Sequence, residues 1–394
     1  MKALICARQL FDGKTSRFLD GAAIVVNNGV IECVARPQDL PPLPSDIQRF
    51  DFPHGTLLPG LIDAHVHLTM DGCADPMTNT LSDSDALAAC RAVQCAAQQI
   101  KAGVTTVRDC GSQNFIAVEL AKAVKSGIIQ KAPRILACGP VICITGGHGS
   151  FIGIEADGPA HVQQAVRGIL KKGADFVKVI ASGGVLTKGT SAGAPQMTYE
   201  ELLAAAQEAK RAGVRITTHA HAGDSIRWAL RAGFDCIEHA TYIDSEIIEL
   251  FQATGAFYIP TVVASVCQME HLDTIPPHVA EKIQKHVEFE YKNLRTMLSL
   301  GVPIAGATDA GTPFNPHGNL PRQLNLLHQY GLSKQEALRA GTYGSAQALG
   351  LEDQTGTLEV GKSADILVVQ GNVLEDLNCL YNVQGVWREG MRLI

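Results

Sequence analysis

Long apolar runs and clusters of positive charge are both missing from this sequence of 394 residues. No stretch of about 18 consecutive apolar residues, the length that marks a transmembrane helix, occurs in it. The apolar run near the first residue is too short for a signal peptide. The formal net charge is −6, and no group of lysines and arginines forms the basic surface that a nucleic acid requires. We therefore expect a cytoplasmic protein whose partners include neither a membrane nor a nucleic acid.

Charged residues are also scarce, and the cysteines show no spacing pattern typical of disulfides. Charged residues make up 18% of the sequence, against about 25% in typical soluble domains. Low charge is expected where many residues lie in parallel strands that are covered on both faces. The 11 cysteines are odd in number and scattered, without a Cys-x-x-Cys motif, which favours reduced thiols over disulfides. The chain is too long for one small domain, so we expect one large core, with or without a satellite domain.

Short apolar segments alternate with helical segments through the middle of the chain. The helical segments have clear end signals: Thr198 and Glu201 form a capping box, and Gly213 ends the same helix. The apolar segments predict eight strands, at 61–67, 104–110, 134–138, 176–180, 215–219, 236–239, 256–260 and 303–307. An α/β pattern of this kind over roughly 290 residues is typical of a (β/α)₈ TIM barrel, whose functional groups gather at the C-terminal ends of the strands.

A doubly wound open sheet is the competing arrangement. It should have a glycine-rich phosphate-binding turn between an early strand and the helix that follows. The sequence Gly147-His148-Gly149 does not serve, because no clear helix start follows it. The barrel is therefore favoured.

Both ends of the chain are predicted to be β structure. Asn27-Asn28-Gly29 is a strong hairpin signal between two apolar segments. The predicted strands at the two ends are 22–26, 30–34, 365–369, 383–387 and 391–394. We predict that residues 1–58 and 354–394 together form a small β-sandwich domain beside a barrel of residues 59–353.

His65 and His67 lie two residues apart in an apolar segment. Side chains two apart project from the same face of a strand, so both imidazoles can reach one metal ion. Structural histidine pairs of this spacing are also common. The metal interpretation gains weight because single ligand-type residues recur at or near the ends of later apolar segments: Lys178, His219, His239 and Asp309.

Lys178 lies inside the otherwise apolar segment 176–180. A lysine that snorkels to solvent or pairs with a carboxylate is one interpretation, since a buried unpaired ammonium is costly. The alternative is that burial favours the neutral amine, which can take up CO₂. The resulting carbamate is an anionic oxygen ligand that can bridge two metal ions.

His219, His239 and Asp309 each follow an apolar run. A single strand-end histidine is often a satisfied core residue, and a single strand-end aspartate is often a helix cap or an ion-pair partner. Two histidines on consecutive strands of a barrel both point to its functional face. Asp309 could then serve as a metal ligand and as a general base.

Taken together, these residues resemble the metal-ligand pattern of the amidohydrolase superfamily. That pattern has His-x-His on the first strand, a carboxylated lysine on the fourth, histidines on the fifth and sixth, and an aspartate on the eighth. The likeness covers essentially the whole chain, including 356–365 near its end. More narrowly, the chain is similar to the imidazolonepropionase-related branch of metal-dependent, prolidase-like dipeptidases and carboxypeptidases. The segments 105–109, 178–184, 219–222 and 237–240 carry this closer likeness.

The resemblance implies a binuclear metal-dependent hydrolase acting on amide or peptide C–N bonds. The implied ligands are His65, His67 and Asp309 for the more buried ion, His219 and His239 for the second, and a CO₂-derived carbamate on Lys178 as the bridge. Imidazole and carboxylate ligands suit two divalent ions such as Zn²⁺, and also manganese or cobalt. A bridging hydroxide would attack the carbonyl, and Asp309 would take its proton and pass it to the leaving nitrogen.

The substrate is expected to be a dipeptide or an N-acyl amino acid with a free carboxylate. In the related dipeptidases, a loop histidine and a tyrosine at positions like those of His148 and Tyr242 bind that carboxylate. A solvent loop with an incidental histidine is the alternative for His148. His221, two residues after His219, is expected to lie beside the metal ligands and near the substrate.

Other activities fit the pattern less well. Deaminases of this superfamily have a glutamate where this chain has Ala222, and imidazolonepropionase lacks the lysine found here as Lys178. Cyclic amides, lactones and aryl amides stay open as substrates. A non-catalytic scaffold is a minor alternative, because all six ligand positions are filled. We also expect a homo-oligomer with a small-molecule or dipeptide substrate.

Overall fold

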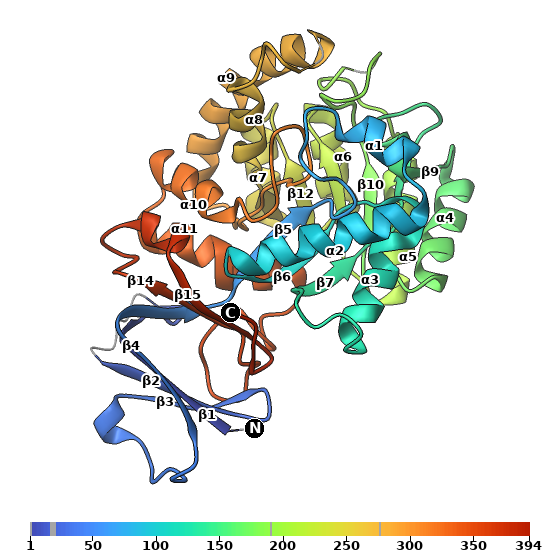
Figure 1. The fold of residues 1–394 in the computed structure, drawn as a ribbon. Coiled ribbons are helices and arrows are strands. Elements are labelled where there is room, and N and C mark those ends of the chain that lie inside the picture. Colours follow the sequence, from blue (N-terminus) through green and yellow to red (C-terminus); the bar gives the residue numbers. More distant parts are fainter. Residues whose placement is uncertain (1, 16–20, 190, 276) are drawn as a thin grey trace.

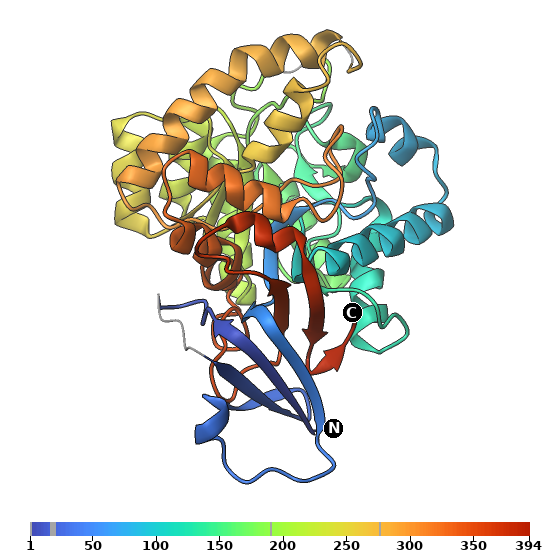
Figure 2. The same ribbon diagram turned by 60° about the vertical axis from the view of Figure 1, so that its left-hand side comes forward.

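The computed structural model describes residues 2–15, 21–189, 191–275 and 277–394. One sheet, built from both ends of the chain, lies beside a larger body of parallel strands and helices (Figures 1 and 2). None of the described helices is both long and apolar enough to cross a membrane.

The terminal sheet has seven strands in the order β16-β15-β14-β4-β1-β2-β3. They are β1 (Lys2–Leu10), β2 (Ala22–Asn27), β3 (Val30–Ala35), β4 (Gln48–Pro59), β14 (Ile366–Gln370), β15 (Val383–Arg388) and β16 (Met391–Arg392). The predicted hairpin joins β2 and β3, and its turn residues Asn28 and Gly29 both have positive φ. Strand β4 pairs with β1 on one side and β14 on the other, which joins the two ends of the chain.

The remaining strands form two parallel sheets. The six-stranded sheet has the order β13-β12-β11-β10-β8-β9, and the three-stranded sheet has the order β5-β6-β7. Their bounds are β5 (Leu61–Val66), β6 (Val104–Asp109), β7 (Arg134–Ala137), β8 (Val141–Cys143), β9 (Gly153–Glu155), β10 (Val177–Ile180), β11 (Ile216–Ala220), β12 (Cys236–His239) and β13 (Phe257–Ile259). This α/β arrangement with parallel strands agrees with the prediction.

The predicted strand at 303–307 is wrong as a regular strand. Residues 303–310 instead pair through isolated bridges, Tyr258 with Ile304 and Val66 with Ala310. Asp309 has φ 58°, a left-handed conformation that interrupts an extended strand. The segment still links β13 to β5, because Tyr258 N donates to Pro303 O and Asp309 N donates to His65 O.

Helices cover the outer faces of the parallel strands (Figure 1). They are α1 (Pro76–Ser82), α2 (Asp85–Lys101), α3 (Ile116–Lys125), α4 (Pro159–Lys171), α5 (Tyr199–Ala212), α6 (Gly223–Ala232), α7 (Ser245–Thr254), α8 (Val262–Met269), α9 (Pro277–Ser299), α10 (Leu320–Gln329), α11 (Lys334–Arg339) and α12 (Ser345–Leu349). The predicted capping box opens α5, and Gly213 ends that helix in the left-handed conformation. The largest apolar core packs most of these helices against the strands.

Candidate metal centre

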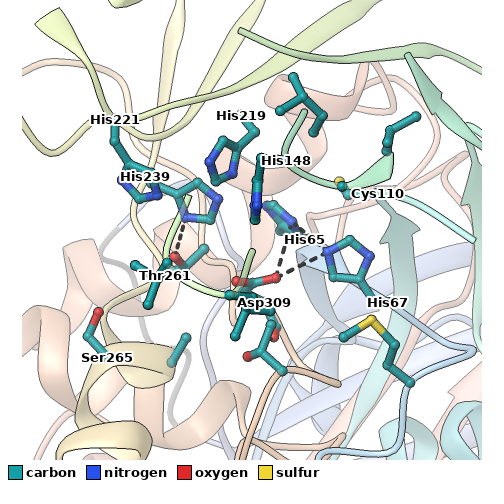
Figure 3. A pocket seen from close by; sticks show the side chains of 18 of the residues that line it. His65, His67, Cys110, His148, His219, His221, His239, Thr261, Ser265 and Asp309 are labelled. Atoms are coloured by element: carbon teal, nitrogen blue, oxygen red, sulfur yellow. Dashed lines mark hydrogen bonds and ion pairs between the residues drawn. The ribbon is translucent and has the colours of Figure 1, made fainter. Parts of the chain in front are cut away.

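The first group of ligand-type side chains is His65, His67 and Asp309, whose candidate ligand atoms all lie within 4.8 Å of one another. His65 is in β5, and His67 is the first residue after that strand. Asp309 Oδ1 is 3.4 Å from His65 Nε2 and 3.2 Å from His67 Nε2 (Figure 3). The backbone bond from Asp309 N to His65 O brings the segment that follows β13 to this strand. The three side chains therefore converge on one point.

The second group is His219, His221 and His239. Their candidate ligand atoms also lie within 4.8 Å of one another. His219 is in β11 and His239 ends β12. Their ring centroids are 4.7 Å apart, and the His221 ring stacks on His239 at 4.9 Å. The ring centroids of His65 and His239 are 5.2 Å apart, so the two groups lie next to each other. His221 is therefore also placed where it could ligate, a role that the resemblance does not assign to it.

Lys178 lies in β10 and lines the same cavity as both groups. Its side chain is buried, and Nζ has no hydrogen-bond partner among the described residues. An unpaired buried ammonium is strongly disfavoured. The snorkelling and ion-paired interpretations both fail, because Nζ reaches neither solvent nor a carboxylate in the described chain. A carbamate facing two cations would satisfy this atom, so the residues fit the implied group.

Glu238 orients His65 from behind. Its Oε2 accepts a hydrogen bond from His65 Nδ1 at 2.8 Å, which leaves Nε2 toward the first group. Its Oε1 accepts from Arg108 Nη2 at 2.6 Å and also contacts Thr217 Oγ1. Burial acts to raise the pKa of Glu238, but Arg108, Lys178 and His65 outweigh it and hold the pKa well below its usual range. A carboxylate that fixes the tautomer of a ligating histidine is a recurrent feature of metal sites.

Two further ligand candidates are oriented through their Nδ1 atoms. His239 Nδ1 lies 2.7 Å from Thr261 Oγ1, and His67 Nδ1 lies 2.9 Å from Gly111 O. The carbonyl of Gly111 can only accept, so His67 Nδ1 carries the hydrogen and Nε2 keeps its lone pair. This is the tautomer that a metal ion requires.

Burial lowers the pKa of three of the four candidate histidine ligands, whereas at His67 the Asp309 carboxylate outweighs burial and raises the pKa. Burial lowers the pKa of His65 to about 4, and it lowers the pKa values of His219 and His239 well below the usual range. Burial alone would raise the pKa of Asp309, but His65 and His67 outweigh it and the pKa is lowered. Neutral imidazoles beside an ionised carboxylate are the protonation states that bind metal.

The backbone is strained at the strand ends that carry the ligands. His239, Ala240 and Asp309 have φ values of 66°, 44° and 58°. A non-glycine residue in the left-handed region costs about 1–3 kcal/mol and tends to occur at functional sites. Two of these three residues are candidate ligands.

The predicted substrate-binding residues differ in position. His148 lines the cavity, with its ring 4.5 Å from His219 and its Nδ1 2.8 Å from Thr187 Oγ1. Tyr242 is half-buried and packs edge-on against His286 at 5.7 Å, and it is absent from the described residues that line the cavity. The structure thus brings His148 to the site but leaves Tyr242 outside its wall.

A single cavity surrounds both groups. Part of its lining is apolar and consists of Met70, Val141, Phe151, Ile152, Ile180, Val185 and Leu186. Polar residues of α8 and α9 line another part. A concave, mostly apolar site with a few convergent polar groups is typical of a binding site for small molecules.

The comparisons with known proteins agree with this geometry. The model of the Amidohydrolase family matches residues 56–393. A Xaa-Pro dipeptidase solved with methionine bound in its active site is 31% identical, with a TM-score of 0.92 over 100% of this chain and 99% of that chain. A prolidase complexed with N-methylphosphonate-L-proline is 26% identical, with a TM-score of 0.91 over 100% and 99% of the two chains. Ochratoxinase from Aspergillus niger is 27% identical over 94% of this chain and 82% of its own length.

The chain therefore belongs to the amidohydrolase family. It is a hydrolase that acts on carbon–nitrogen bonds.

Proposed function

We propose that this protein is a two-metal amidohydrolase that cleaves the amide bond of a dipeptide or an N-acyl amino acid with a free carboxylate. The observation that carries the proposal is Lys178, a buried amine without a partner in the described chain, on the wall shared by two groups of metal-ligand side chains. One imidazole group alone would fit a single ion. A lysine able to form a bridging carbamate fits two.

The proposed ligands are His65, His67 and Asp309 for one ion, His219 and His239 for the other, and carboxylated Lys178 for both. When bound, the two ions would lower the pKa of a water molecule and polarise the scissile carbonyl. Asp309 Oδ1 faces His65 and His67, where it can hold the water's proton and return it to the leaving nitrogen. The cavity's apolar wall excludes bulk water and receives an apolar group of the substrate.

We also propose a (β/α)₈ barrel over residues 59–353 and a β-sandwich from residues 1–58 and 354–394. The barrel is supported by the segment that links β13 to β5, which is the contact that closure requires. The sandwich is supported by one buried cluster that joins strands from both ends of the chain, including Ile5, Ile24 and Trp387.

We expect two divalent ions per chain in protein produced with added metal and bicarbonate. Imidazole and carboxylate ligands suit Zn²⁺. Elemental analysis measures the stoichiometry, and removal of the ions by a chelator should abolish amide hydrolysis until metal is restored. A stoichiometry of one ion or none in such protein would contradict the two-metal proposal.

The substrate proposal predicts a preference for a free carboxylate. Amidating the carboxylate of a hydrolysed dipeptide should lower kcat/KM by about 10-fold or more, the typical value of a hydrogen bond to a charged group. His148→Ala should mainly raise KM for the acid and change little for the amide. Tyr242→Phe is the comparison variant, with a smaller effect, because Tyr242 does not line the cavity. Equal turnover of acid and amide would contradict the carboxylate requirement while leaving amide hydrolysis standing.

A further inference from the structure

One wall of the cavity has polar side chains that the proposed metal ligands do not use. Ser265 and Gln268 come from α8, and His286 and Glu290 come from α9. Glu290 and Gln268 are 3% and 4% exposed. Helix α8 begins directly after Thr261, which contacts His239, so this wall adjoins the second group of histidines (Figure 3).

Two hydrogen-bond acceptors on this wall lack a donor among the described residues. Glu290 Oε2 and Gln268 Oε1 are buried acceptors without a partner among the described residues. Ser265 is the side chain that bonds Glu290, and it supplies a hydroxyl without charge. Buried acceptors in native proteins are almost always paired, and buried carboxylates are paired with a cation. Two such atoms facing one cavity therefore point to a ligand that donates hydrogen bonds.

The electrostatics of the wall agree with this. Burial and, to a lesser extent, the nearby Asp309 carboxylate raise the pKa of Glu290 to about 7, and the described chain places no cation beside it to lower this value. His286 is four residues earlier on the same helix, and burial lowers its pKa to about 4. The ring is neutral near pH 7 and gives Glu290 no positive charge.

We propose that Glu290, with Gln268, binds a cationic group of the substrate, either the α-ammonium of a dipeptide or a basic side chain. Both groups present several N–H donors and a positive charge, which match a carboxylate and an amide oxygen. The inference rests on the proposed function and narrows its substrate class. Glu290 would set specificity by direct contact and would take no part in breaking the amide bond.

The test uses three pairs of substrates that differ in one positive charge. Alanyl-leucine and its N-acetyl form test the α-ammonium. N-acetyl-alanyl-lysine with N-acetyl-alanyl-norleucine, and N-acetyl-lysyl-leucine with N-acetyl-norleucyl-leucine, test a basic side chain on either side of the bond. Metal-loaded wild type, Glu290→Gln and Glu288→Gln are compared. Glu288 is the matched control because it is an exposed carboxylate on the same helix.

In at least one pair we expect the wild type to favour the cationic member by about 10- to 100-fold in kcat/KM, the range for a hydrogen bond between charged groups. Glu290→Gln should bring this ratio close to one, and Glu288→Gln should keep it. The ratio is measured within one preparation, so partial misfolding of a variant cancels. The pair that responds identifies the cation as the α-ammonium or a side chain.

Two results would overturn the inference: no preference for the cationic member in any pair, or a preference that Glu290→Gln leaves intact. The second would mean that Glu290 is a protonated structural residue. Failure of the proposed function is a separate result. It would appear as no hydrolysis of any of the six amides by protein that holds two ions per chain.

Discussion

Replacing Asp309 with asparagine should lower kcat by about 10²- to 10⁴-fold, the usual contribution of a general acid–base group. Asparagine has nearly the same shape and can keep one oxygen toward His65 and His67, but its amide cannot take up and return a proton. The protein should stay folded and should retain at least one ion. KM should change much less than kcat, since the proposed contacts to the substrate's carboxylate and apolar groups lie elsewhere in the cavity. Steady-state kinetics with elemental analysis on the same sample measure both effects.

Asp353→Asn is the control for this variant, because Asp353 is exposed. It should behave as the wild type. Wild-type turnover by Asp309→Asn would assign the proton transfer to another residue. His221 would be the first to examine, since its ring stacks on His239 within the second group.

The convergence of the candidate ligands could be predicted from the sequence for a physical reason. Parallel strands with helical crossovers all end on one face, so ligand-type residues at strand ends must meet there. His65, His67, Lys178, His219 and His239 obey this rule, and each is found on the wall of the same cavity. Asp309 joins them although its segment is not a regular strand, because single backbone bonds are enough to place it.

The residues that orient the ligands were not predicted. Arg108 and Glu238 form a buried ion pair between β6 and β12, and Glu238 fixes His65 on a third strand. The sequence does contain a signal, since each is a charged residue inside a predicted strand. Which charged residues pair depends on strand neighbours far apart in the chain, and periodicity does not contain that information.

Tyr242 shows a second limit of prediction from the sequence, which is the direction of the chain after a strand end. The resemblance implies that Tyr242, three residues after His239, binds the carboxylate of the substrate. His239 and Ala240 instead adopt the left-handed conformation, and this changes the direction of the chain at that point. The Tyr242 ring therefore packs against His286 and Phe289.

Strands β8 and β9 were not predicted from the sequence, because three residues are too few to show an alternating pattern.

Replacing Lys178 with alanine should remove the second ion and lower kcat/KM by about 10³-fold or more, since a catalytic metal contributes several kcal/mol to transition-state stabilisation. The carbamate is the only anionic ligand proposed to contact both ions. Its loss leaves the second ion on neutral imidazoles. Metal content and activity should fall together, and a short carboxylate such as formate or acetate should restore part of both by entering the vacated space.

Lys178→Arg should not rescue activity, because guanidinium stays charged and cannot take up CO₂. Lys171→Ala, at the exposed end of α4, is the control and should keep both ions. Uptake of isotope-labelled bicarbonate by the wild type, and its loss in Lys178→Ala, gives a readout independent of turnover. A fully active Lys178→Ala protein with two ions would make the lysine structural. The two histidine groups would then have to hold both ions without a bridging side chain.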